Sequence, residues 1–140
     1  MIAKNESRFY LRTVLILLCT FMVTGVALGA GPMEQSLASG GKVLLHFTST
    51  PLMTMTETPF AIDLTSPSGN IEEDAVITLG LDMPAMPMPP NHPQVVFRDG
   101  HYQGTAVFTM AGAWQVEMMI RHADGVVEQV VFDIDKVLMK

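Results

Sequence analysis

The stretch Trp114–Ile134, WQVEMMIRHADGVVEQVVFDI, carries the clearest fold signal in this sequence of 140 residues. Apolar and polar residues alternate from Trp114 to Arg121, which is the period-two pattern of a half-buried strand. The residues expected to point inward are Trp114, Val116, Met118 and Ile120, whereas Met119 points outward. Asp124-Gly125 then marks a turn before a second strand over residues 126–134. This stretch predicts an antiparallel hairpin with one face in a core.

The same alternation continues upstream of this hairpin. Further strands are expected over residues 42–48, 60–65, 75–81 and 102–110, with turn residues between them. Asp99-Gly100 is the dipeptide favoured in a two-residue type I′ turn, which would pair Phe97 with Tyr102. About seven short strands without an amphipathic helix predict an all-β protein, an immunoglobulin-like β-sandwich, after the N-terminal helix described next.

The N-terminus has the pattern of an export or anchor segment. Three basic residues, Lys4, Arg8 and Arg12, precede an uncharged run over residues 13–33, and about 20 apolar residues suffice to cross a bilayer. We therefore expect a signal peptide or transmembrane anchor over residues 1–30, a linker over 31–41 and the sandwich domain over 42–140. This arrangement places the domain on the extracytoplasmic, periplasmic face of the membrane, or in secreted form if the signal is cleaved.

Cysteine content and charge exclude several function classes. Cys19 is the only cysteine and lies in the apolar run, so the predicted domain has no thiol for disulfides or thiolate metal sites. Residues 30–140 carry 5 Lys and Arg against 13 Asp and Glu, which argues against a nucleic-acid partner. Motifs of nucleophilic catalysis or phosphate binding are missing from the sequence, and we expect a binding protein that is not an enzyme.

The stretch Leu81–Pro93, LDMPAMPMPPNHP, is the strongest chemical signal, and we call its part from Met83 to Pro93 the Met/Pro segment. It holds three of the 12 methionines, followed by His92, and its prolines exclude a helix or a central strand. Thioethers beside an imidazole suit Cu(I). In a straight polyproline path Met83 and Met86 lie roughly 9 Å apart, so a single metal needs a bend or a ligand from another loop. Met53 and Met55 would supply that ligand if their loop folds toward the same end.

Two readings without a metal remain open at this point. The Met/Pro segment is also typical of an apolar loop that closes the end of a sandwich, or of an exposed face that docks on a membrane complex. Elsewhere, His101 and His122 flank turns, where solvated histidines are common, and the run Glu72-Glu73-Asp74 has the pattern of a solvated turn.

Four features in order resemble the YtkA-like / FixH family of membrane-anchored extracytoplasmic domains, between about Leu44 and Ile134. They are the segment from Thr50-Pro51-Leu52 to Leu64, the motif Met83-Pro84-Ala85-Met86, the segment Gly100–Gly104 around Tyr102, and the turn Met110-Ala111-Gly112-Ala113-Trp114. The resemblance implies an immunoglobulin-like sandwich with one N-terminal membrane span. For the FixH branch it also implies copper supply to a haem-copper oxidase of the cbb type. Pro87 departs from the family pattern, which more usually has glycine there.

Together these observations predict a membrane-tethered β-sandwich that binds copper as Cu(I), in copper handling or oxidase assembly. The expected ligands are Met83, Met86 and Met88, with His92 as a harder ligand and a contribution from Met53 or Met55. The expected partners are the copper ion and a membrane oxidase or copper-transport complex. Because thioethers bind without releasing protons, such a site should retain Cu(I) at acidic pH.

Overall fold

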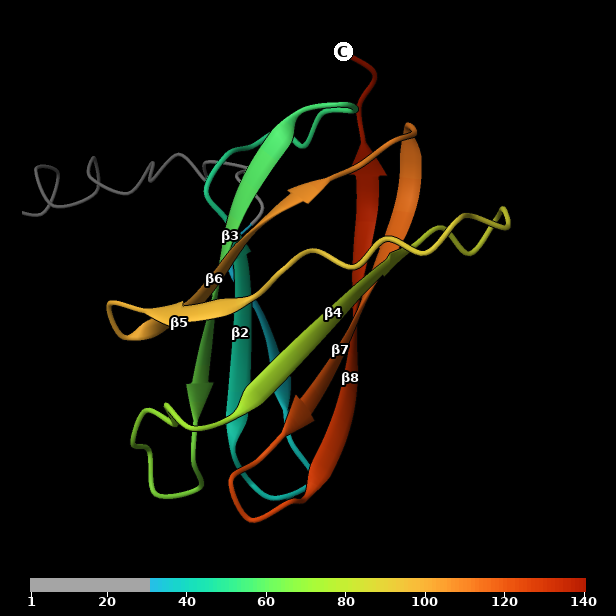
Figure 1. Ribbon diagram of the computed structural model, residues 1–140. Helices are drawn as coiled ribbons and strands as arrows, with labels where there is room; N and C mark the ends of the chain where they lie inside the picture. The colour runs from blue at the N-terminus through green and yellow to red at the C-terminus, as the bar shows by residue number, and fades with distance from the viewer. Residues whose placement is uncertain (1–30) are drawn as a thin grey trace, which may run out of the picture.

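Two antiparallel sheets, packed face to face, make up the domain (Figure 1). The computed structural model describes residues 31–140. One sheet has the strand order β1-β2-β3-β6-β5 and the other β4-β7-β8. The strands are β1 (Met33–Ser36), β2 (Lys42–Phe47), β3 (Glu57–Thr65), β4 (Val76–Asp82), β5 (Val96–Arg98), β6 (His101–Val107), β7 (Gly112–Arg121) and β8 (Val127–Val137). The predicted all-β sandwich is confirmed.

The segment expected to be a linker, residues 31–41, instead contributes strand β1. This strand pairs antiparallel with β2, with Met33 opposite Leu45 and Ser36 opposite Lys42. Its polar residues are exposed on an edge strand, but Met33 packs against the core and Leu37 is buried. A short polar strand with one apolar anchor is hard to tell from a linker by composition, so the described residues contain eight strands where about seven were expected.

The core follows the alternation read from the sequence. Trp114, Val116, Met118 and Ile120 on β7 are each at most 1% exposed, and Met119 between them is 48% exposed. The rings of Trp114 and Phe108 meet edge to face at 5.4 Å. Phe97 pairs with Tyr102 across a turn in which Asp99 and Gly100 both have positive φ, as the type I′ prediction requires.

The predicted anchor or signal segment, residues 1–30, lies outside the described residues. Between residues 31 and 140 there is no helix able to cross a bilayer.

The sandwich has two ends of different character, which are the upper and lower ends of Figure 1. We call the upper one the methionine end. It comprises the loop before β3, the β6–β7 connection, the chain after β8 and the start of the Met/Pro segment. We call the lower one the polar end, and it comprises the β1–β2, β3–β4 and β7–β8 connections.

Candidate metal centre

The Met/Pro segment begins with a β-turn over Met83–Met86. The amide of Met86 donates to the carbonyl of Met83 at 3.0 Å, and Pro84 holds the second position, where its fixed φ is favourable. Such a turn brings its first and last Cα atoms within about 7 Å, closer than a straight polyproline path allows. The bend that a one-metal site requires is therefore present.

The three methionines of the segment differ in how far they are buried. Met83 is 7% exposed, and its Cε lies 2.7 Å from the position of a Cβ built on Gly112, so this glycine leaves the space that the methyl group occupies. Met88 is partly buried against the core, and Met86 is 45% exposed. Met83 thus anchors the segment, Met86 is open to a ligand, and Met88 is partly covered by the core.

His92 lies beside the free edge of β4 in a fixed orientation. Its Nδ1 is 2.9 Å from the carbonyl oxygen of Leu79, and the neighbouring amide of Leu81 donates to the carbonyl of Asn91 at 2.8 Å. These two bonds satisfy backbone groups that an edge strand would otherwise leave to solvent. A carbonyl oxygen only accepts, so Nδ1 carries the proton and the lone pair of the neutral ring is on Nε2.

This arrangement is the one that metal-binding histidines commonly use. A ligating imidazole almost always donates its second N–H to a carbonyl or carboxylate, which fixes the tautomer and the ring orientation. The ring of His92 also packs over Gly80, where an added Cβ would lie 3.5 Å from Nδ1 and Cε1. His92 can cover the edge of β4 and bind a metal at the same time, because Nδ1 bonds to Leu79 and Nε2 is left for the metal.

Met53 and Met55 lie at the same end of the sandwich, on the other side of the β6–β7 connection. Met53 forms a bridge with Leu138, and the amide of Met55 donates to the carbonyl of Phe108 at 2.8 Å. Met83, by contrast, reaches Gly112 at the far end of that connection. In Figure 1 the Met/Pro segment extends to the right, away from the loop before β3.

Harder donor groups do not gather around a metal position in the described part of the chain. Within residues 31–140, no group of three or more His, Asp or Glu side chains is arranged to hold a metal ion. Carboxylate and imidazole clusters are the sites of zinc and of hard cations. A thioether site belongs to a different class, and its donor set favours a soft ion.

A YtkA-like family model matches residues 42–119, from the start of β2 to near the end of β7. The chain belongs to the YtkA-like family. No curated protein matches it in sequence. The match includes Met53, Met55, the whole Met/Pro segment and the β6–β7 connection, and it excludes β8 and the chain after it.

Solved structures support the fold of this YtkA-like domain. A DUF4426 family protein from Pseudomonas aeruginosa PAO1 superposes with a TM-score of 0.57 at 8% identity, over 77% of this chain and 95% of that one. The copper-reconstituted P19 protein from Campylobacter jejuni superposes with a TM-score of 0.50 at 11% identity, over 75% of this chain and 92% of that one. At such identities the likeness shows the fold alone.

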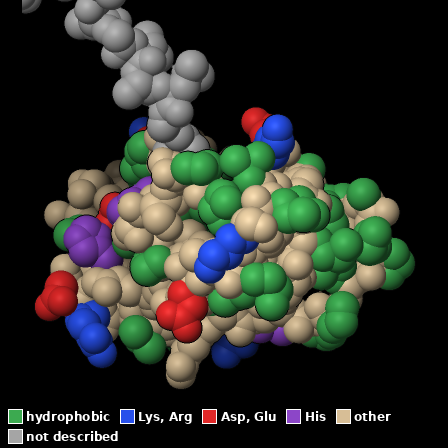
Figure 2. All heavy atoms as spheres, turned by 90° about the horizontal axis from the view of Figure 1, so that it is seen from above, with side chains coloured by type: hydrophobic (Ala, Val, Ile, Leu, Met, Phe, Trp, Pro, Cys, Tyr) green, Lys and Arg blue, Asp and Glu red, His purple; other side chains and the backbone are tan. Residues whose placement is uncertain are grey.

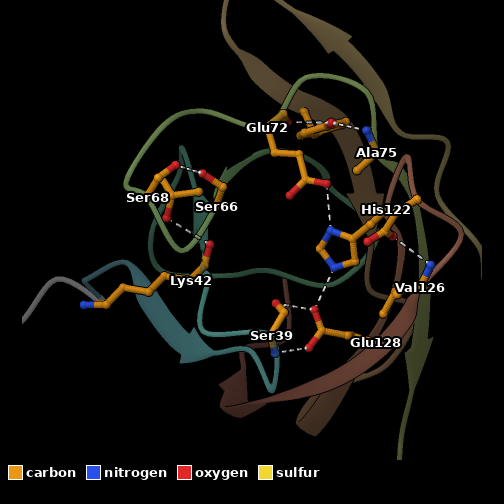
Figure 3. Close-up of polar contacts among 12 residues, drawn as sticks. Ser39, Lys42, Ser66, Ser68, Glu72, Ala75, His122, Val126 and Glu128 are labelled. Atoms are coloured by element: carbon orange, nitrogen blue, oxygen red, sulfur yellow. Dashed lines mark hydrogen bonds and ion pairs between the residues drawn. The ribbon is translucent and has the colours of Figure 1, made fainter.

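At the polar end, the YtkA-like domain holds a charged cluster that the sequence did not reveal (Figure 3). Nδ1 of His122 lies 2.7 Å from Oε1 of Glu72, and Nε2 lies 2.6 Å from Oε2 of Glu128. The backbone amide and the hydroxyl of Ser39 donate to Glu128 at 2.8 and 2.9 Å. The cluster therefore joins all three connections of the polar end.

The pKa shifts in this cluster follow from its contacts. Burial disfavours the charged imidazole, but the hydrogen bonds to Glu72 and Glu128 outweigh it and raise the pKa of His122 above 6.5. Burial also opposes the charged form of Glu128, yet the bonds from Ser39 and His122 lower its pKa below 4.5. Both ring nitrogens donate to carboxylates, which is the bonding of an imidazolium.

The expectation of solvated residues was wrong for His122 and Glu72, whereas Glu73 and Asp74 are exposed as expected. The side chains of His122, Glu72 and Glu128 are 11%, 20% and 9% exposed. Glu72 lies 50 residues before His122 in the chain, so no local spacing could have connected them. His101, the other turn histidine, is half exposed and pairs with Asp63, in line with the expectation.

Proposed function

We propose that this protein binds Cu(I) at the Met/Pro segment, through the sulfurs of Met86 and Met88 and Nε2 of His92. The observation that carries the proposal is the bond from Nδ1 of His92 to the carbonyl of Leu79, which leaves the lone pair of Nε2 for a metal. The same segment holds one exposed thioether, Met86, and one partly buried thioether, Met88. Met83, at the first position of the same turn, is the fourth candidate ligand. Its burial makes anchoring its first role.

The chemistry of this donor set favours copper over other common metals. Zinc sites in proteins use thiolates, imidazoles and carboxylates, and the Met/Pro segment has neither a thiolate nor a carboxylate. Thioethers select soft ions, of which Cu(I) is the common biological case. The P19 protein, which was studied in copper-reconstituted form, has a similar sandwich, and at 11% identity it supports the fold while the residues support the metal.

We place this activity in copper handling or oxidase assembly on the extracytoplasmic side of a membrane, with residues 1–30 as anchor or signal. The placement is supported by the basic and apolar pattern of those residues. In this proposal copper is the cargo, and a membrane oxidase or copper-transport complex receives or delivers it. The role is binding rather than catalysis.

The alternative is an interaction module that docks on a membrane complex without any metal. The exposure of Met86 favours it, and so does the gathering of hydrophobic side chains toward the side of the molecule where the Met/Pro segment lies (Figure 2). Methionine surfaces pack adaptably against partners. Copper binding needs the sulfur atoms of the methionines, whereas docking on a partner needs only their apolar volume. Replacing methionine by leucine therefore distinguishes the two functions.

The test is Cu(I) competition with a chromogenic chelator under reducing, anaerobic conditions, with the full-length chain. A Met86→Leu/Met88→Leu variant keeps apolar volume and removes both sulfurs, so it should bind one Cu(I) equivalent fewer than the wild type. Met119→Leu is the matched control, because Met119 is equally exposed on β7 and lies outside the segment. It should leave binding unchanged.

His92→Gln tests the imidazole separately. The glutamine amide can still donate to the carbonyl of Leu79, but it lacks the imidazole nitrogen that binds a soft metal. We expect the affinity for Cu(I) to fall at least tenfold while the fold is preserved. Wild-type protein that binds no Cu(I), or a leucine variant that binds as the wild type does, would reject the copper site and favour the docking function.

A further inference from the structure

Three backbone segments lie side by side at the methionine end. The segment Leu52–Met55 is flanked on one side by Leu138, whose amide donates to the carbonyl of Leu52 at 2.9 Å and whose carbonyl accepts from Thr54 at 2.8 Å. On its other side lies Phe108, which pairs with Thr54 and accepts from the amide of Met55. Because paired strands are about 4.8 Å apart, the segments after Phe108 and after Leu138 lie on the two sides of Met55.

Each of these segments ends in an exposed methionine. Met55 is 67% exposed, Met110 is 39% exposed and Met139 is 77% exposed. Their neighbours Leu52 and Thr54 are buried beneath this end, so the core is already closed without the three side chains. Apolar packing accounts for Leu52, but it does not account for three solvent-facing methionines.

The backbone of Met55 is also unusual. Its φ of +53° lies in the left-handed region, which few residues other than glycine, asparagine and aspartate adopt. Such conformations are strained and occur preferentially at binding sites. Met55, with this left-handed backbone, ends the middle one of the three segments.

The three side chains are long enough to converge. The segments that carry Met110 and Met139 each lie one strand spacing from the segment of Met55, and each of the two methionines is one residue out of register with Met55. Methionine has three rotatable bonds and no branch, so its side chain can span such an offset. Thioethers are neutral and soft, and three of them around one ion suit Cu(I) or another soft monovalent cation. Met53 alternates with Thr54 and adds a fourth sulfur to the same segment.

We infer that Met55, Met110 and Met139 form a second soft-cation site, separate from the one at the Met/Pro segment. The inference does not depend on the proposed function, because it uses none of Met83, Met86, Met88 or His92. The new site lies over the Phe108 and Leu138 ends, whereas the Met/Pro segment runs along the edge of β4. Met110 and Met139 had no role in the expected ligand set.

Silver titration of the full-length chain labelled with ¹³C at the methionine methyls tests this site. Ag(I) is soft, monovalent and diamagnetic, so binding is read directly from each methyl resonance. We expect the resonances of Met55, Met110 and Met139, assigned by single Met→Leu variants, to shift together and to saturate at one equivalent. Met119, exposed on β7, should not shift. If Met119 shifts in parallel, the binding is generic to exposed thioethers and the site is rejected.

Two leucine variants test the second site and the proposed copper site independently. Met55→Leu/Met110→Leu/Met139→Leu should lose one Ag(I) equivalent and keep the shifts of Met86 and Met88. Met86→Leu/Met88→Leu should keep the shifts of the other three. Loss of the Met/Pro response alone would reject the proposed function and leave the second site standing. Wild-type resonances of the three residues that stay unchanged would overturn the second site even if the triple variant fails to fold.

Discussion

The two ends of the sandwich are held together by different forces. At the polar end a buried imidazolium joins Glu72 and Glu128, and Ser39 ties the β1–β2 connection to the same carboxylate. At the methionine end the segments are joined by backbone bonds, such as Thr54 to Leu138 and Met55 to Phe108, and several of their methionines are exposed. The polar end uses its titratable groups for stability. At the methionine end Met83 is buried and anchors its segment, whereas the exposed sulfurs have no structural role; they belong to Met55, Met86, Met110 and Met139. Ligand binding is therefore expected at the methionine end.

The largest effect should come from removing the histidine of the polar end. His122→Ala leaves two mostly buried carboxylates without their shared cation, and we expect the free energy of unfolding to fall by about 2–3 kcal/mol. Urea denaturation measures this change. His101→Ala is the control, because its pair with Asp63 is half exposed, and it should cost less than about 1 kcal/mol. Equal losses in the two variants would mean that the polar end has no special role.

A smaller loss of stability is expected when a side chain is added at Gly112, where the methyl group of Met83 packs. Gly112 has a φ of +127°, and an added Cβ would lie 2.7 Å from Cε of Met83. Gly112→Ala should lower the free energy of unfolding by about 1–2 kcal/mol and shift the methyl resonance of Met83. Gly125→Ala also has positive φ but meets nothing within 4 Å, so it reports the backbone strain alone. If the methyl resonance of Met83 does not shift, this methyl group does not pack against Gly112.

The pH dependence of stability should reflect the polar end. The raised pKa of His122 contributes stability that is complete below pH 6.5 and is lost as the pH rises through its folded-state value. The lowered pKa of Glu128 contributes stability that is complete above pH 4.5 and is lost as the pH falls through its folded-state value. Denaturation midpoints measured across pH 4 to 9 should therefore be highest between about 4.5 and 6.5. His122→Gln should remove the decline on the alkaline side, and a variant that keeps it would place its origin elsewhere.

The smallest stability effect should be at Met86. This side chain is 45% exposed and leucine preserves its apolar volume, so Met86→Leu should change the free energy of unfolding by no more than about 0.5 kcal/mol. The same variant should weaken Cu(I) binding. A large loss of stability would make Met86 a packing residue and would remove the contrast between the two ends.

Local sequence patterns predicted most of the fold because burial alternates along each strand. Trp114 to Ile120 on β7 and the turn at Asp99-Gly100 follow directly from that alternation and from turn chemistry. Strand β1 escaped prediction because an exposed polar edge strand has no such alternation. The sequence argument required either a bend or a ligand from another loop for a one-metal site, and the structure has a bend at Met83–Met86, where Pro84 favours the turn.

The parts of the site that depend on distant contacts could not be predicted. The tautomer of His92 is fixed by Leu79 across the edge of β4, 13 residues away, and the cluster of His122 uses Glu72 from the β3–β4 loop. Likewise, the row of Met55, Met110 and Met139 exists only because Leu52–Met55 lies between the ends of β6 and β8. In each case the sequence shows which residue is present, but the residues that contact it come from distant parts of the chain and are known only from the fold.

The most direct test of the copper proposal is X-ray absorption at the copper edge of the full-length chain loaded with Cu(I). The account predicts sulfur neighbours together with the scattering pattern of one imidazole, and loss of that imidazole pattern in His92→Gln. The second methionine site contains no histidine, so the imidazole pattern reports the Met/Pro segment alone. A spectrum without sulfur neighbours, or an imidazole pattern that survives in His92→Gln, would contradict the account.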